Sequence, residues 1–206
     1  MIAGYAAALA VSYLLGAIPT SYLAGKLGRG IDLREHGSKN LGATNVYRIL
    51  GWKYAVPVGL FDIAKGAIPV MLIGPAVVES EFFPLLCGVF AVVGHVFSVF
   101  VHFKGGKGVA TSAGVVLGMA PLAVGVALVI WALLVWLTGY VSLGSIVAAA
   151  VFPVLVHALY PGRREHLWVY AAMAAVIIWM HRANIRRLLA GTENRFGTRR
   201  HSPPAA

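Results

Sequence analysis

The chain alternates between long apolar stretches and short polar stretches along its whole length. Most of the apolar stretches approach the roughly 20 residues that a helix needs to cross a hydrocarbon core of about 30 Å. The pattern therefore predicts an all-α polytopic membrane protein, a bundle of transmembrane helices joined by short polar loops. The apolar stretches cover residues 2–23, 54–78, 82–101, 109–120, 121–137, 145–160 and 167–180.

The stretch of residues 109–137 decides how many times the chain crosses the membrane. It is longer than one span needs and shorter than two full spans, and Pro121 near its middle ends or kinks a helix. Basic residues gather in 26–53 and in the tail after residue 181, and the positive-inside rule places both in the cytoplasm. An even number of crossings must then separate them. We therefore predict two short helices here and seven transmembrane helices in all, with the N-terminus outside and the C-terminus inside; a re-entrant hairpin is the alternative.

Composition supports lipid as the main solvent of the chain. Of the 206 residues 59% are hydrophobic and 12% charged, whereas soluble domains carry about 25% charged residues. The net charge of +10 lies mostly in loops and tail, which fits topology and anionic ligands better than a nucleic-acid partner. The single cysteine, Cys87, excludes an internal disulfide and a cysteine-based metal cluster. We expect one domain over 1–206, with a disordered basic tail over 194–206.

The first candidate site lies in the twelve positions from Gly37 to Arg48, which combine small residues, hydroxyls, amides and two cations. Backbone N–H groups near a helix start bind phosphate, and an arginine grips two phosphate oxygens at once. The alternative is an ordinary loop in which Ser38 or Asn40 caps a helix. The candidate residues of this stretch are Ser38, Asn40, Gly42, Thr44, Asn45 and Arg48.

The second candidate site is a glycine-rich stretch in which two lysines flank and interrupt three glycines before an apolar helix. Flexible backbone donors, a helix N-terminus and two positive charges suit an anion. The spacing differs from that of a Walker-type phosphate loop. A tight cytoplasmic turn is the alternative. The candidate residues are Lys104, Gly105, Gly106 and Lys107.

Two weaker signals follow later in the chain. Ser142 and Ser145 precede and open the sixth apolar stretch, where capping a helix is the plainer interpretation. His181 and Asn184 are three residues apart and so share a helix face, next to arginines that also suit anionic headgroups. Inside the second apolar stretch, Asp62 and Lys65 have the same spacing and predict a buried ion pair.

Together these stretches resemble the bacterial acyl-phosphate:glycerol-3-phosphate acyltransferase family of integral membrane enzymes. Lys39, where the family also carries glycine, and Gly144, where serine is common, depart from its pattern. The matching residues are Gly37-Ser38-x-Asn40-x-Gly42-Ala43-Thr44-Asn45-x-x-Arg48, Lys104-Gly105-Gly106-Lys107-Gly108-Val109-Ala110-Thr111, Ser142-Leu143-x-Ser145-Ile146, and His181-x-x-Asn184 with Gly191-Thr192-Glu193.

The resemblance implies a reaction of phospholipid biosynthesis. A fatty acyl group passes from acyl phosphate to the 1-hydroxyl of glycerol 3-phosphate, which gives 1-acyl-glycerol 3-phosphate (lysophosphatidic acid) and phosphate. It also implies seven spans in the bacterial cytoplasmic (inner) membrane, an active site on the cytoplasmic side, and membrane lipid around the chain. We expect no metal, no cofactor and no obligate protein partner.

The resemblance also assigns roles to the candidate residues. Ser38, Asn40 and Thr44 would hold the acyl-phosphate headgroup, with the acyl tail between helices and open to lipid. The proton of the attacking hydroxyl goes either to His181 or to the substrate's own phosphate, which we favour. The expected catalytic residues are Ser38, Arg48, Lys107, His181 and Asn184; the expected glycerol 3-phosphate ligands are Arg48, Lys107, Ser145, His181 and Asn184.

Two other functions compete with this hypothesis. A transporter of a phosphorylated solute would also need several spans and an anion site, but it should carry polar residues along its spans. In this chain the polar residues are concentrated between the apolar stretches. A lipid-linked phosphotransferase would need metal-binding carboxylates, which the candidate stretches lack.

Overall fold

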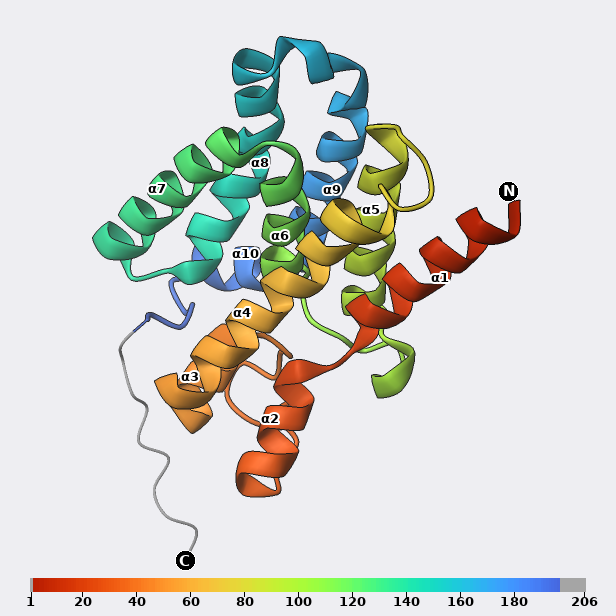
Figure 1. Ribbon diagram of the computed structural model, residues 1–206. Coiled ribbons are helices and arrows are strands. Elements are labelled where there is room, and N and C mark those ends of the chain that lie inside the picture. The colour runs from red at the N-terminus through yellow and green to blue at the C-terminus, as the bar shows by residue number, and fades with distance from the viewer. Residues whose placement is uncertain (1, 197–206) are drawn as a thin grey trace, which may run out of the picture.

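The computed structural model describes residues 2–196, and every regular element in this range is helical, which confirms the all-α prediction (Figure 1). The elements are α1 (Ile2–Ala17), α2 (Thr20–Arg29), α3 (Ala43–Leu50), α4 (Trp52–Ile68), η1 (Pro69–Ile73), α5 (Phe82–Val96), η2 (Val99–Val101), α6 (Val109–Met119), α7 (Pro121–Thr138), α8 (Val141–Leu159), η3 (Pro161–His166), α9 (Leu167–Met180) and α10 (Arg182–Leu189).

Five helical stretches in the described residues are long and apolar enough to cross a membrane. Two further predicted spans correspond to shorter helices, α6 with 11 residues and α9 with 14. The count of seven spans and the orientation of the termini therefore stay predictions. The five stretches are Ile2–Arg29, Trp52–Ile73, Phe82–Val101, Pro121–Thr138 and Val141–Leu159.

The ambiguous stretch 109–137 forms two helices, α6 and α7, that meet at Ala120. Pro121 occupies the first turn of α7, where a missing backbone N–H leaves no helical hydrogen bond unmade. From this turn the two helices diverge (Figure 1), and α7 packs mainly along α8. Side chains of α6 and α7 both line the cavity described below.

Helices α4 and α6 pack with their backbones in direct contact. A Cβ atom added to Gly66 would overlap the carbonyl of Thr111, and one added to Gly114 would overlap the carbonyl of Ile63. Small residues let helices approach closely in a membrane, where packing replaces the hydrophobic effect as the main attraction between helices. This contact holds the start of α6, and with it the glycine-rich stretch, against α4.

The predicted ion pair inside the second apolar stretch is present. Lys65 Nζ lies 2.8 Å from Asp62 Oδ1, and both side chains are only 1% exposed. The hydroxyl of Thr20 donates to the same carboxylate oxygen at 2.6 Å, and Lys65 Nζ donates to the carbonyl of Ile18 at 2.9 Å. The first apolar stretch breaks at this point, between α1 and α2, so the lysine of the ion pair also ties α4 to the backbone at the break.

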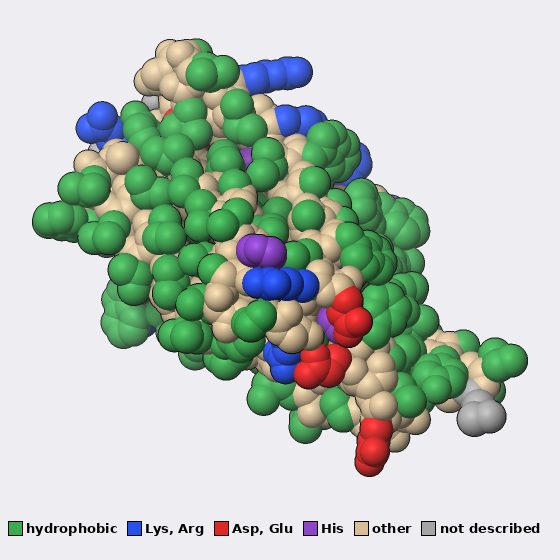
Figure 2. Space-filling model, turned by 90° about the horizontal axis from the view of Figure 1, so that it is seen from above, with side chains coloured by type: hydrophobic (Ala, Val, Ile, Leu, Met, Phe, Trp, Pro, Cys, Tyr) green, Lys and Arg blue, Asp and Glu red, His purple; other side chains and the backbone are tan. Residues whose placement is uncertain are grey.

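One end of the bundle carries side chains of both charges, since Arg163 and Arg164 also lie there and Arg163 Nη2 is 3.1 Å from Glu81 Oε1. The turns before α5 and between α8 and α9 hold Glu79, Glu81 and Glu165, all exposed. Viewed from this end, acidic side chains lie beside basic and histidine side chains on a largely hydrophobic surface (Figure 2). Helices α2, α3 and α10 lie toward the opposite end (Figure 1). That end collects the basic stretches, as the charge pattern predicted.

Candidate active site

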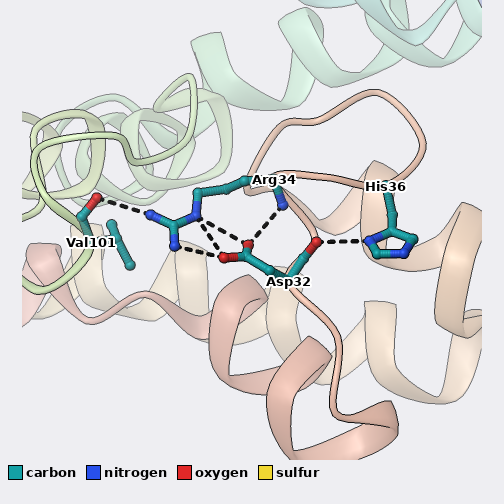
Figure 3. Close-up of polar contacts among 4 residues, drawn as sticks. All are labelled: Asp32, Arg34, His36 and Val101. Atoms are coloured by element: carbon teal, nitrogen blue, oxygen red, sulfur yellow. Dashed lines mark hydrogen bonds and ion pairs between the residues drawn. The ribbon is translucent and has the colours of Figure 1, made fainter.

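An arginine clamps the polar loop that follows α2 (Figure 3). Arg34 Nε lies 3.0 Å from Asp32 Oδ1, and Arg34 Nη2 lies 2.6 Å from Asp32 Oδ2. These hydrogen bonds hold the pKa of Asp32 below its usual range, so the pair stays ionised at neutral pH. Arg34 Nη1 also donates to the carbonyl of Val101 at 3.3 Å. The loop is thereby tied to the segment that leads into the glycine-rich stretch.

The side-chain amide of Asn45 folds the same loop onto the start of α3. Its Oδ1 accepts the N–H of Ser38 at 2.9 Å, and its Nδ2 donates to the carbonyls of Leu33 and His36 at 3.2 and 3.1 Å. Both amide donors are therefore in use. Asn45 lines the cavity described below, and its hydrogen bonds also position Ser38 there; its expected contact with substrate stays a prediction.

In the glycine-rich stretch, two of the backbone N–H groups that were expected to be free for an anion already have hydrogen-bond partners. The N–H of Gly105 donates to the carbonyl of Val96 at 3.0 Å, and the N–H of Gly106 donates to the carbonyl of His95 at 3.1 Å. These two N–H groups are thus engaged with the end of α5. They hold the stretch in place and are not presented to an anion.

Packing explains the glycine at position 106. A Cβ atom there would overlap the carbonyl of Leu41 in the first loop and the imidazole of His95. The close approach brings the two loops together and directs Lys107 into the cavity that both loops line. Lys104 is exposed and does not line this cavity. Of the two lysines, the structure therefore brings only Lys107 to the other candidate residues.

A hydrogen-bonded network joins Lys107 to Glu193, which lies in the segment that follows α10. Lys107 Nζ donates to Asn184 Oδ1, and Asn184 Nδ2 donates to Glu193 Oε1 at 2.7 Å. Ser142 Oγ donates to the same oxygen at 3.0 Å, and Arg187 Nε to Glu193 Oε2 at 2.6 Å. The Glu193 side chain is only 4% exposed. This carboxylate links three of the four sequence stretches.

Glu193 was not among the predicted site residues. The signal that could have found it is a single acid within a strongly basic tail, because a buried carboxylate needs partners that satisfy it. Burial alone would raise the pKa of Glu193, but the hydrogen bonds from Arg187, Asn184 and Ser142 outweigh burial and lower it. The carboxylate is therefore charged at neutral pH.

The cations around Glu193 outnumber it. Burial lowers the pKa of Lys107 to about 8; Glu193 opposes this shift, and the charges of Arg187 and Arg48 add to it. Burial also lowers the pKa of Arg48 from its usual high value. At neutral pH three cations surround one carboxylate. This excess of partly buried positive charge suits anionic ligands.

His181 lies at the junction between α9 and α10. Its Nδ1 lies 2.8 Å from the carbonyl of Ile177, which can only accept, so Nδ1 carries the proton. Burial and then the charge of Lys107 lower the pKa of His181 to about 4. The ring is neutral at pH 7 and offers Nε2 to the cavity as a hydrogen-bond acceptor.

The first residues of the expected disordered tail are held against the site. Arg48 Nη2 donates to the carbonyl of Asn194 at 3.4 Å, and the Phe196 ring stacks on that of Tyr47 with centroids 4.9 Å apart. These contacts differ from the expectation that the tail is disordered from residue 194 onward. Residues 197–206 lie outside the described part of the chain.

One cavity of about 430 Å³ unites these groups. Its mouth is polar, and its inner part is lined by apolar side chains of α6, α7, α8 and α9. Of the predicted residues, Lys104, Gly105 and Gly106 do not line it. Those that do are Ser38, Asn40, Gly42, Thr44, Asn45, Arg48, Lys107, Ser142, Ser145, His181 and Asn184.

Relatives of known sequence match nearly the whole chain. A family model described as glycerol-3-phosphate acyltransferase matches residues 6–191. The glycerol-3-phosphate acyltransferase of Chlorobaculum parvum is 42% identical over 228 residues, covering 95% of this chain and 98% of the relative. That of Chlorobaculum tepidum is 43% identical and covers 93% of this chain and 96% of the relative.

Solved structures give the same result. PlsY, an integral membrane glycerol 3-phosphate acyltransferase, is 39% identical in its glycerol 3-phosphate form, with a TM-score of 0.87. Its lysophosphatidic acid form has a TM-score of 0.83. Each alignment covers 94% of this chain and 96% of the solved chain.

Proposed function

The chain belongs to the glycerol-3-phosphate acyltransferase family and is an integral membrane acyltransferase, and from this premise we propose that it transfers a fatty acyl group from acyl phosphate to the 1-hydroxyl of glycerol 3-phosphate. The observation that carries the proposal is the two-part cavity, whose cationic mouth opens into an apolar interior. A ligand that fills both parts has a phosphate head and a long hydrocarbon tail. Acyl phosphate and lysophosphatidic acid both have this form.

Each substrate brings a phosphate to the mouth of the cavity. Arg48 and Lys107 bind the phosphate of glycerol 3-phosphate, since both are partly buried cations that line the cavity. Ser38, Asn40 and Thr44 hold the acyl-phosphate headgroup from the opposite loop. The Lys107–Asn184–Glu193 network keeps the lysine in place before substrate arrives, which lowers the cost of organising the site during reaction.

The chemistry needs little from the protein beyond position and charge. The 1-hydroxyl oxygen attacks the acyl carbonyl, the bond from that carbon to phosphate breaks, and the departing phosphate takes the hydroxyl proton. His181 has a pKa of about 4, too low for an efficient base at neutral pH. Its Nε2 instead accepts the hydrogen bond of the glycerol hydroxyl and orients it. His181 is therefore assigned a positioning role.

The placement in the membrane follows from the same site. Glycerol 3-phosphate is water-soluble, so the polar mouth faces the cytoplasm, which places the C-terminus inside and, with seven spans, the N-terminus outside. This orientation also puts the basic end of the bundle in the cytoplasm, as the positive-inside rule requires. In a bacterium the membrane concerned is the cytoplasmic (inner) membrane.

Purified protein in lipid nanodiscs, given an acyl phosphate and labelled glycerol 3-phosphate without divalent metal, should form lysophosphatidic acid. The same assay with the acyl group supplied as a coenzyme A thioester should give little product, because the mouth is arranged for a small phosphate head. Comparable rates with the thioester would refute the proposed donor. Uptake of glycerol 3-phosphate into vesicles without acyl transfer would instead establish the transporter.

A further inference from the structure

The inner end of the cavity is closed by side chains from four helices. Tyr170 of α9 is 1% exposed and Phe152 of α8 is 8% exposed, and both line the cavity. Their rings meet edge to face, with centroids 5.7 Å apart and an angle of 75° between the planes. Val116 of α6 and Val124 of α7, both buried, line the cavity beside them, close to the turn that joins these two helices.

The depth of the cavity is comparable with the length of an acyl chain. Along α8, the rise from Ser142 at the mouth to Phe152 is about 15 Å, and the rise along α9 from His181 to Tyr170 is about 16 Å. A carbon–carbon bond of about 1.5 Å at a bond angle of about 111° advances an extended chain by roughly 1.25 Å per carbon. About twelve extended carbons therefore reach from the mouth to the two rings.

One side wall of the cavity also faces lipid. Leu128 of α7 lines the cavity although its side chain is 53% exposed. It lies on the helix that diverges from α6 below their shared turn (Figure 1). The cavity wall is thus exposed to the bilayer at α7, whereas Tyr170 and Phe152 at the other end are buried.

The Tyr170 hydroxyl has no hydrogen-bond partner among the described residues, although it is buried. The ring is therefore held by packing against Phe152 and its other neighbours, and a phenylalanine at position 170 would keep the same shape. This separates the effect of the ring from that of the hydroxyl in an experiment.

Resting on the proposed function, we propose that Tyr170 and Phe152 form the stop against which the end of the acyl chain lies, and so set the chain length that the enzyme prefers. A chain that just fills the cavity leaves no void and needs no bend. A longer chain must fold back or bend out toward lipid past α7, and a shorter one leaves part of the apolar wall without contacts; both lose packing with the cavity wall.

The test uses the full chain in nanodiscs and a series of saturated acyl phosphates from roughly 10 to 18 carbons, a range that brackets the depth of the cavity. Tyr170→Ala should move the optimum to longer chains and raise the kcat/KM ratio of long to short donors by about tenfold. Tyr170→Phe, the matched control, should keep the wild-type profile. The KM for glycerol 3-phosphate should be the same in all variants, because the mouth is untouched.

A second variant shortens the cavity, whereas Tyr170→Ala lengthens it. Ala149 lines the cavity between Ser145 and Phe152, and leucine there should shift the optimum to shorter chains. Unchanged profiles in active Tyr170→Ala and Ala149→Leu proteins would overturn the inference and leave the proposed function intact. A wild-type protein that transfers none of the acyl groups would overturn the proposed function, and the inference with it.

Discussion

The mouth and the interior of the cavity are built in different ways. Loops and helix ends far apart in the sequence form the mouth, where each polar group depends on another: Asn45 holds Ser38, and Glu193 holds Asn184, which holds Lys107. Facing helices form the interior, where the side chains only have to leave space of the right shape. Changes at the mouth should therefore reduce the rate, and changes in the interior should alter which donor is used.

Removing the charge of Lys107 should have the largest effect. Lys107→Met deletes a partly buried cation from the proposed phosphate site, and kcat/KM for glycerol 3-phosphate should fall about 100-fold, as for loss of one preorganised charged donor. Initial rates of lysophosphatidic acid formation measure this. Lys53→Met is the matched control, because Lys53 is an exposed lysine outside the cavity. Equal losses in both variants would show that general surface charge, and not the mouth, is responsible.

Adding one methyl group where the glycine-rich stretch touches the first loop should have the next largest effect, a loss of stability. In Gly106→Ala the new Cβ overlaps Leu41 and His95, and such overpacking lowers the free energy of unfolding by about 2 kcal/mol. Thermal unfolding in detergent reports this loss. Gly162→Ala, at a position where a Cβ meets nothing, should leave the midpoint unchanged. A Gly106→Ala protein as stable as wild type would mean that the two loops are not packed as described.

The pH dependence of kcat/KM should show the titration of Lys107. Lys107 is charged below its pKa of about 8 and neutral above it, so kcat/KM for glycerol 3-phosphate should be maximal below about pH 7 and decline above pH 8. One pH unit beyond the pKa, only about a tenth of the lysine keeps its charge. Lys107→Arg keeps the charge and should move the decline to higher pH. The same alkaline decline in Lys107→Arg would assign the titration to another group.

Releasing the first loop should have the smallest effect. Arg34→Gln removes the partly exposed ion pair with Asp32 and the contact with Val101, at a cost of about 0.5 kcal/mol. We expect about a twofold rise in the KM for acyl phosphate, because Ser38 lies on this loop. Steady-state kinetics with acyl phosphate as the varied substrate measure it. A change as large as that of Lys107→Met would place Arg34 in the mouth itself.

The helices could largely be predicted from hydrophobic pattern, because a chain in lipid must satisfy its backbone within helices. The hairpin at Pro121 was predicted from the proline and from the basic stretches on either side, which require an even number of crossings between them. The break between α1 and α2 was not, since residues 2–23 read as one apolar stretch. Pro19 marks the break, but a proline within an apolar stretch can also only bend a helix. Lys65, whose ammonium group donates to the carbonyl of Ile18 at the break, comes from a different helix.

The candidate site likewise has some features that could be predicted from the sequence and others that only the structure revealed. Residue types and spacing identified Ser38, Arg48, Lys107, His181 and Asn184, because hydroxyls, amides and cations are rare in so apolar a chain. The roles of Asn45, Gly106 and Glu193 depended on contacts across long sequence separations. A glycine that binds an anion and a glycine that lets two loops touch look alike in the sequence.

The sequence by itself determined that the chain is a helical membrane protein of the acyltransferase family, since apolar length and local chemical groups are properties of neighbouring residues. Only the tertiary structure decided which lysine reaches the cavity, which carboxylate joins the cations, and where the apolar interior ends. These features depend on distances between helices that are far apart in the sequence but in contact in space. Such distances follow from packing, which no local sequence pattern encodes.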